Sequence, residues 1–209
     1  GSGTTSELVT GGTAGTLITE VIDNMYSAFP TTAVPMLSSA IASNGTVGYA
    51  YFFQDATVAD SRLYYGIRSG TTTAPIFAQN IVTSHMEGGA SPLFVGSYPS
   101  LAYDSSSNPI IAFYNGVAAE QNLNVARSFN GGVSFNVVTV DNKTGSSTNL
   151  GQYPSVSTYG TAIGIAYYDV TNTGLKFARW TPTYCWRRFS VDGLTGTGSC
   201  GNASDDSGK

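Results

Sequence analysis

The sequence predicts an all-β protein built from short antiparallel strands. Helix-favouring patterns are nearly absent over its 209 residues, and only 11% of the residues are charged. Short apolar runs rich in Ile, Val, Phe and Tyr alternate with turn signals made of Gly, Asn, Ser and Pro, which is the pattern of strands joined by tight turns. Hydrophobic residues make up 41% of the chain, so it can bury a substantial core, and an all-β chain of this length often forms one domain.

The clearest group of strands lies between Tyr98 and Asp141. Strands are expected at Ser100–Ala102, Ile110–Tyr114, Leu123–Arg127 and Phe135–Val140. A Ser-Ser-Ser-Asn-Pro turn, a polar loop and an Asn-Gly-Gly turn separate them. Four strands in about 45 residues is the length of one β-propeller blade, so we expect a blade of four antiparallel strands here.

The same four-strand unit occurs three times along the chain. The Tyr-Pro-Ser-Leu sequence at Tyr98–Leu101 recurs at Tyr153–Val156, and Val34–Leu37 is a weaker copy. The later strands of the three copies fall at Ala50–Phe52, Ala112–Tyr114 and Ala166–Tyr168 (ends of the second strands), Leu63–Gly66, Leu123–Arg127 and Leu175–Arg179 (third strands), and Ile76–Val82, Phe135–Asp141 and Trp186–Asp192 (fourth strands). Three copies in register predict β-propeller-like blades at residues 34–97, 98–152 and 153–209.

A lone strand is expected before the first blade. Thr16–Asp23 resembles a fourth strand, with Asp23 in the place of Asp141 and Asp192, so residues 16–33 are interpreted as an outer strand and a linker. Propellers close with about four to eight blades, so three blades leave two apolar faces exposed. We therefore expect either further blades from a longer chain or self-association of copies of this chain.

Composition narrows the classes of partner. The net charge is −4, and no Lys/Arg cluster exists beyond Arg187-Arg188, so the basic stripe of a nucleic-acid binder is missing. No apolar run approaches the roughly 18 residues of a membrane span. His85 is the only histidine, which excludes a histidine-based metal cluster, and no cofactor is expected. The abundance of Gly, Ser, Thr, Asn and Tyr favours an extracellular or cell-surface location.

The two cysteines, Cys185 and Cys200, permit one disulfide. An even count in a chain with an exported composition is consistent with a bridge, and the alternative is two free thiols. A structural zinc site needs four ligands, so these two residues alone do not make one. We predict a disulfide that fixes the edge of the last blade.

The segment Ser128–Phe135 resembles the Asp-box, the Ser-x-Asp-x-Gly-x-x-Trp turn of sialidase-type propellers. Ser128, Gly132 and Phe135 match the motif, and Asn130 stands in place of the usual Asp. A short polar side chain bonds local amides in such a turn, and Gly adopts a conformation barred to other residues. The resemblance implies a β-propeller, whose ligand would lie on the face opposite these turns.

The catalytic residues of sialidases are not matched by this sequence. The family uses three arginines, a Tyr–Glu pair and an acidic Asp, whereas here no Tyr–Glu pair can be assigned. Arg127 and Arg179 occupy equivalent repeat positions, with Arg68 near the corresponding site, which indicates a structural role. We expect no enzyme. The alternative, a fragment of a sialidase-like glycoside hydrolase, requires the three arginines to converge on the ligand face.

That ligand face is formed by the loops after the second and fourth strands of each blade. Its candidate ligand-binding residues are Asp55, Asp60, Tyr98, Asn115, Glu120, Tyr153 and Asp169. Aromatic rings with amides and carboxylates suit saccharides, which offer both C–H faces and hydroxyls. The sequence therefore indicates a non-enzymatic binding module, with a glycan as the ligand suggested by fold analogy.

Two alternatives stay open at this stage. The two tyrosines can instead pack between blades while the polar loop residues are solvated. The chain can also be a structural subunit of a surface filament, in which exposed blade faces or the Thr16–Asp23 strand join neighbouring chains.

Overall fold

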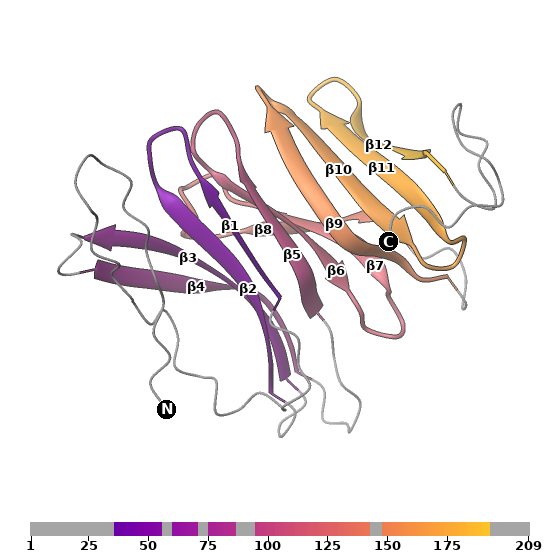
Figure 1. Cartoon of the computed structure of the whole chain (residues 1–209), viewed down its shortest axis with the longest axis horizontal. Coiled ribbons are helices and arrows are strands. Elements are labelled where there is room, and N and C mark those ends of the chain that lie inside the picture. Colours follow the sequence, from indigo (N-terminus) through magenta and orange to yellow (C-terminus); the bar gives the residue numbers. More distant parts are fainter. Residues whose placement is uncertain (1–35, 56–59, 71–74, 87–94, 143–147, 193–209) are drawn as a thin grey trace, which may run out of the picture.

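The structure is a computed structural model, and it describes residues 36–55, 60–70, 75–86, 95–142 and 148–192. All regular elements in these ranges are strands, arranged as three four-stranded antiparallel sheets (Figure 1). No helix in the described ranges is long and apolar enough to cross a membrane. The all-β prediction with four-stranded, propeller-like blades is confirmed.

Each sheet follows the chain from one strand to the next. The first sheet contains β1 (Leu37–Ile41), β2 (Val47–Asp55), β3 (Asp60–Gly70) and β4 (Pro75–Met86). The second contains β5 (Val95–Tyr103), β6 (Pro109–Asn115), β7 (Asn122–Arg127) and β8 (Asn136–Asp141). The third contains β9 (Leu150–Tyr159), β10 (Ala162–Asp169), β11 (Gly174–Thr181) and β12 (Cys185–Ser190).

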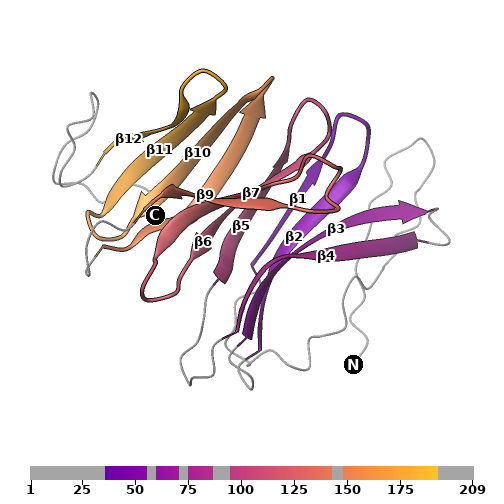
Figure 2. The ribbon, with the colours of Figure 1, turned by 180° about the vertical axis from the view of Figure 1, so that it is seen from behind.

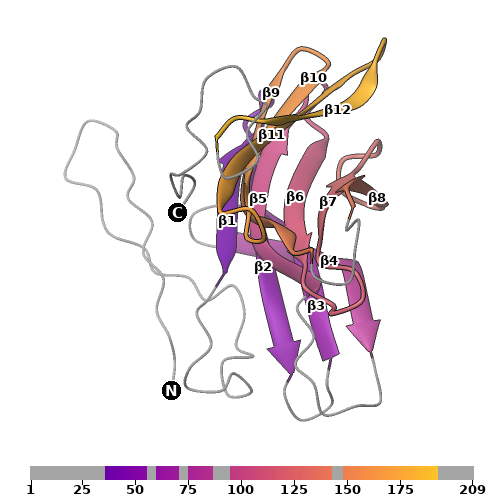
Figure 3. The same ribbon diagram turned by 90° about the vertical axis from the view of Figure 1, so that its right-hand side faces the viewer.

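Successive sheets meet through their first strands, because β5 contacts both β1 and β9. Figures 1 and 2 show the three sheets in one row, and Figure 3 shows them one behind another when viewed along that row. The β1–β2 and β9–β10 hairpins point to the same side of the row (Figure 1). We call this side the hairpin face, and the opposite side, where β2, β6 and β10 end, the loop face.

Two apolar clusters fill the spaces between the sheets. Leu63 and Tyr65 of the first sheet pack with Leu101 and Phe113 of the second, and the cluster between the second and third sheets is built in the same way. All residues of β6 are buried, whereas β9 exposes alternate residues from Tyr153 onward. The middle sheet is thus covered on both faces, and one face of the third sheet is open.

The Gly-x-Tyr-Pro-Ser segments form irregular starts of β5 and β9. Gly96 and Gly151 have φ of +95° and +98°, a region that L side chains rarely adopt. A Cβ at Gly96 would lie 2.6 Å from Leu63 Cβ, and one at Gly151 would lie 2.5 Å from Leu123 N. Only glycine therefore lets each first strand approach the third strand of the preceding sheet this closely.

A serine hydroxyl links each first strand to the next. Ser38 Oγ accepts the Leu101 N–H, and Ser100 Oγ accepts the Val156 N–H, both at 3.0 Å. Ser38 lies opposite Ala50 just as Ser100 lies opposite Ala112. The first repeat is therefore aligned two residues later than the predicted Val34–Leu37 copy, because the recurring serine sets the register and the proline does not.

Hydrogen bonds from backbone amides to polar side chains shape the β7–β8 turn, and the Asp-box resemblance itself stays a prediction. Ser128 Oγ accepts the Gly132 N–H at 2.8 Å, and Asn130 Oδ1 accepts the Ser134 N–H at 3.0 Å. Gly132 has a φ of +95° and lies against the Tyr65 ring. Phe135 meets the same ring edge-on, with centroids 5.4 Å apart. This turn therefore closes the space between the first and second sheets.

Two sequence predictions involve the ends of the chain. Thr16–Asp23 lies outside the described residues, so the lone outer strand stays a prediction. Cys185 carries a free, exposed thiol at the start of β12, so the structure does not support the predicted bridge to Cys200, which also lies outside the described residues.

Candidate ligand-binding site

Two tyrosines form an aromatic surface at the loop-face ends of β5 and β9. The Tyr98 and Tyr153 rings are tilted by 48° with centroids 4.3 Å apart, and we call this pair the tyrosine platform. Tyr153 is 52% exposed and Tyr98 is partly buried. Both have left-handed backbones, with φ of 52° and 50°. Adjacent rings in this uncommon conformation indicate that the bulged strands hold them in place.

The platform rests on a third tyrosine. The Tyr114 ring lies 6.3 Å from that of Tyr98, and its hydroxyl donates to Asn149 Oδ1 at 2.9 Å. Burial raises the pKa of Tyr98 to about 12, and the hydrogen bond to Tyr153 acts in the same direction. Burial also raises the pKa of Tyr114. These phenols therefore stay neutral near pH 7 and keep both donor and acceptor capacity.

The first sheet contributes a different side chain at this level. Tyr98 N–H donates to Met36 Sδ at 3.2 Å, and Met36 occupies the first-sheet position that corresponds to Tyr98 and Tyr153. The first sheet has Met-Leu-Ser where the later sheets have Tyr-Pro-Ser, so it lacks the aromatic ring at this position. The platform consequently spans the second and third sheets only.

Asn115 and Glu120 lie together in the loop after β6. Asn115 is buried, and its amide donates to Glu120 Oε2. Its Oδ1 accepts the Val117 N–H at 3.2 Å. These bonds shape residues 116–121 and leave the exposed Glu120 as the side chain of the pair that solvent reaches.

Asp169 has the equivalent role after β10. It is 4% exposed, its Oδ1 accepts the Asn172 N–H at 3.1 Å, and its Oδ2 accepts the Asn172 side-chain amide at 2.9 Å. Lys176 Nζ lies 4.0 Å from the same carboxylate. The carboxylate is therefore committed to the fold of its own loop.

Asp55 and Asp60 face each other in register at the ends of β2 and β3. This position lies on the loop face, as the sequence predicts. Their side chains are outside the described part of the structure, so a ligand-binding role for them stays a prediction.

The arginines lie on the opposite face from the platform. Arg68 is opposite Val47 at the start of β2, and Arg179 is opposite Gly164 near the start of β10. Arg127, at the end of β7, places its guanidinium 4.4 Å from the centre of the Trp180 ring. The three arginines are thus on the hairpin face of three different blades, and they do not form the convergent set on the loop face that a sialidase-like site requires.

A buried ionic network, which sequence reasoning did not identify, joins the second and third sheets. Asp141 Oδ2 accepts the Tyr167 hydroxyl at 2.6 Å and pairs with Lys176 Nζ, and Arg188 lies 3.5 Å from its other oxygen. Burial and the Asp141 charge raise the pKa of Tyr167 well above its usual value. The repeated Asp141 and Asp192 were the only signal for this network in the sequence.

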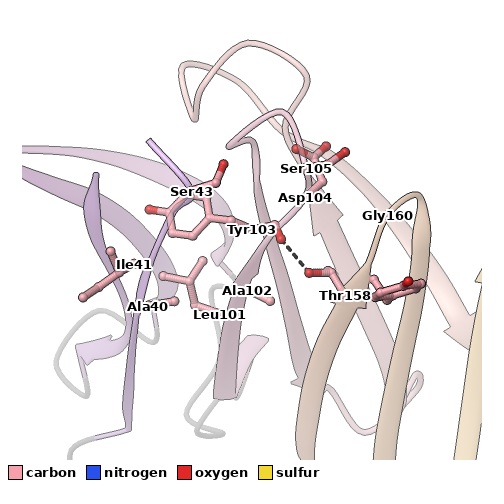
Figure 4. Close-up of a pocket in the computed structure, with 11 residues that line it drawn as sticks. Ala40, Ile41, Ser43, Leu101, Ala102, Tyr103, Asp104, Ser105, Thr158 and Gly160 are labelled. Carbon is pink, nitrogen blue, oxygen red and sulfur yellow. Dashed lines mark hydrogen bonds between the residues drawn. The ribbon is translucent and has the colours of Figure 1, made fainter. Parts of the chain in front are cut away.

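A shallow open groove of about 420 Å³ lies at the hairpin-face ends of the first strands (Figure 4). Its walls include Ile41, Leu101 and Tyr159, and Thr158 Oγ1 donates to the Tyr103 carbonyl across its base at 2.6 Å. Asp104, its acidic residue, accepts bonds from backbone amides of its own turn. The groove is mostly apolar and offers no catalytic pair.

Metal binding finds no support in the described ranges, where no group of three His, Cys, Asp or Glu side chains is close enough to hold an ion. The carboxylates of Glu120, Asp169 and Asp141 are engaged with amides or cations.

No family model and no curated protein matches the chain. Solved structures do show a likeness in fold. The α-L-arabinofuranosidase of Fusarium graminearum in complex with an iminosugar inhibitor aligns with a TM-score of 0.50 and 13% identity, over 79% of this chain and 52% of that one.

Two other solved structures align less closely. An engineered GH43 glycoside hydrolase with endo-xylanase and exo-arabinofuranosidase activity gives a TM-score of 0.43 and 9% identity, over 74% of this chain and 28% of that one. A neuraminidase-like protein of subtype N10 from A/little yellow-shouldered bat/Guatemala gives a TM-score of 0.33 and 11% identity, over 77% of this chain and 58% of that one. The chain thus spans from about a quarter to three-fifths of the lengths of these proteins, and the likeness to the arabinofuranosidase, at a TM-score of 0.50, bears on the fold alone.

Proposed function

We propose that this chain is an extracellular, non-enzymatic β-propeller module that binds a glycan on the tyrosine platform. The observation that carries the proposal is the contact of the exposed Tyr153 ring with the partly buried Tyr98 ring on the loop face. Aromatic rings present an apolar surface to the C–H face of a sugar, and phenol hydroxyls at the ring edges can bond its hydroxyls.

Polar groups beside the platform support a carbohydrate ligand over an apolar one. Asn149 bonds Tyr114 directly below the platform, and the exposed Glu120 lies on the same loop face. The fold shared with an arabinofuranosidase complex is an analogy in the same direction. The composition, poor in Lys and Glu, agrees with an extracellular location.

The engaged carboxylates support binding without turnover. Glycoside hydrolysis needs two carboxyl groups about 5–9 Å apart on either side of the scissile bond. Asp169 and Asp141 are buried and hydrogen-bonded or salt-bridged, so neither is available to protonate a leaving group or to attack a sugar.

The test is glycan-array screening of the whole chain, followed by titration of the best glycan against two variants. Tyr153→Ala should weaken binding about tenfold, because one aromatic contact contributes about 1–1.5 kcal/mol. Tyr184→Ala is the matched control, since Tyr184 is 60% exposed and lies on the hairpin face. Equal losses for both variants would contradict the platform, and steady release of sugar from the bound glycan would contradict the non-enzymatic role.

A further inference from the structure

The first and third sheets each have one face that no other described sheet covers. On the first sheet, Leu37 and Ile41 are 68% and 72% exposed. On the third sheet, Ser155 and Tyr159 lie on the open side of β9, and both are exposed. The two faces belong to the sheets at the two ends of the row (Figure 1). The repeats allow the missing contacts to be worked out position by position.

The first contact is seen between the first and second sheets, where a side chain fits over a glycine. An added Cβ at Gly48 would clash with the hydroxyl of Tyr103, which also bonds Tyr65 Oη at 2.9 Å. The first sheet therefore forms a socket of Gly48 and Tyr65 that receives Tyr103 from the second sheet.

The open ends carry both halves of this contact. Gly164 and Phe177 are the third-sheet counterparts of Gly48 and Tyr65. The strand pairing gives this equivalence, because Ala166 lies opposite Phe177 as Ala50 lies opposite Tyr65. Ile41 corresponds to Tyr103, since it faces Val47 as Tyr103 faces Pro109. The open third sheet thus has the socket, and the open first sheet has an exposed apolar side chain at the inserting position.

The second recurring contact is the serine bridge between first strands. Ser155 is the third-sheet counterpart of Ser38 and Ser100, because it faces Ala166 as they face Ala50 and Ala112. Ser39 is the first-sheet counterpart of the donor residues of the bridge. An acceptor hydroxyl at one end of the row therefore matches a backbone donor at the other.

The third contact is ionic and is seen between the second and third sheets. Asp192 lies two residues beyond β12 and bonds the Leu175 carbonyl, at the position equivalent to Asp141 opposite Leu123, where Asp141 meets Tyr167 and Lys176. Their first-sheet counterparts are two tyrosines, Tyr51 and Tyr64, which face each other in register. Arg62 Nη1 donates to the Tyr64 hydroxyl at 3.3 Å, so a cation lies where an incoming carboxylate would need one.

We propose that the open third-sheet face binds the open first-sheet face of a second copy of this chain, and that two copies close head to tail into a six-bladed ring. A head-to-tail contact closes into a ring when its rotation permits. Propellers contain about four to eight blades, and the three sheets of the described residues give six blades in a pair of copies, which falls in that range. Apolar insertion, the serine bridge and charge complementarity all favour this partner.

Solution mass by light scattering across a concentration series is the first test. The wild-type chain should reach twice the mass of the single chain and stop there. Ile41→Glu places a charge at the inserting position, and Ser155→Arg obstructs the other face, so each should halve the mass. Val133→Glu is the matched control, because Val133 is 73% exposed in the β7–β8 turn, on neither open face, and it should leave the pair intact.

Mixing the two disruptive variants tests the head-to-tail geometry. Ile41→Glu keeps an intact third-sheet face, and Ser155→Arg keeps an intact first-sheet face, so an equimolar mixture should recover a species of double mass. Circular dichroism that matches the wild type establishes that each variant is folded. A monomeric wild type, an unchanged mass for either variant, or a mixture that stays monomeric would overturn the proposal.

Discussion

Removal of the Asp141 carboxylate tests whether the buried ionic network holds the second and third sheets together. In Asp141→Ala, Tyr167 loses the acceptor for its buried hydroxyl, a charge-assisted bond worth about 1.5–3 kcal/mol. Lys176 is left with Asp169 at 4.0 Å, which compensates it in part. The Arg188 pair adds little, since that side chain is 50% exposed. We therefore expect a loss of about 3 kcal/mol, at the lower end for a broken buried pair.

Urea unfolding followed by tryptophan fluorescence measures this loss. With an m-value of about 3 kcal/mol/M for a chain of this size, the midpoint should fall by about 1 M urea. Lys176→Met should lower the free energy of unfolding by less than Asp141→Ala does, and the variant with both changes should show a coupling energy of about 1–2 kcal/mol. Glu120→Gln, an exposed carboxylate change, should stay within about 0.5 kcal/mol of the wild type. A loss below about 1 kcal/mol for Asp141→Ala, or strict additivity in the cycle, would refute the reasoning.

Two further predictions concern the bulged first strands. Gly151→Ala should destabilise the fold by more than about 2 kcal/mol, because its φ is +98° and the new Cβ would lie 2.5 Å from Leu123 N. Gly160→Ala is the control, and with open space around it the change should destabilise the fold by about 1 kcal/mol. Thermal melts of both variants measure the difference. The second concerns pH. Because the pKa of Tyr98 is about 12 in the folded state against 10.0 for a free phenol, the folded state holds its proton longer, so stability should be constant below pH 10 and fall as the pH rises toward 12. Absorbance titration should show Tyr98 ionising earlier in Tyr153→Phe, and no difference between the two proteins would contradict the hydrogen bond.

The strands of the blades could be predicted from the sequence because each blade repeats local signals. Ile110–Tyr114 is a continuous apolar run between a proline turn and a polar loop, and it became β6, buried on both faces. The first repeat was aligned two residues too early, because Pro35 resembled the proline of the later copies. The hydroxyl of Ser38 sets the true alignment, and its partner lies in another sheet, which local pattern does not reveal.

The candidate site was predictable only in part for the same reason. Tyr98 and Tyr153 were placed on the loop face from strand order, but their mutual contact depends on how far one first strand slides along the next. The Asp141 network was even harder to predict from the sequence. Its tyrosine and lysine come 26 and 35 residues later in the chain, from two strands of another sheet. An aspartate that recurs as Asp141 and Asp192 gives no indication of those partners.

The Gly-x-Tyr-Pro-Ser segment combines residues that pack the sheets together with the residue that forms the tyrosine platform. Its glycine lets the strand touch the preceding sheet, and its serine binds the following strand. The tyrosine between them is held in a left-handed conformation by contacts on both sides. The first sheet keeps Ser38 but has Met36 in place of the tyrosine, so packing there is retained without an aromatic surface. The serine is therefore kept in all three blades, whereas the tyrosine is present only in the two that build the platform, and this separation is what the proposed glycan-binding role of the rings predicts.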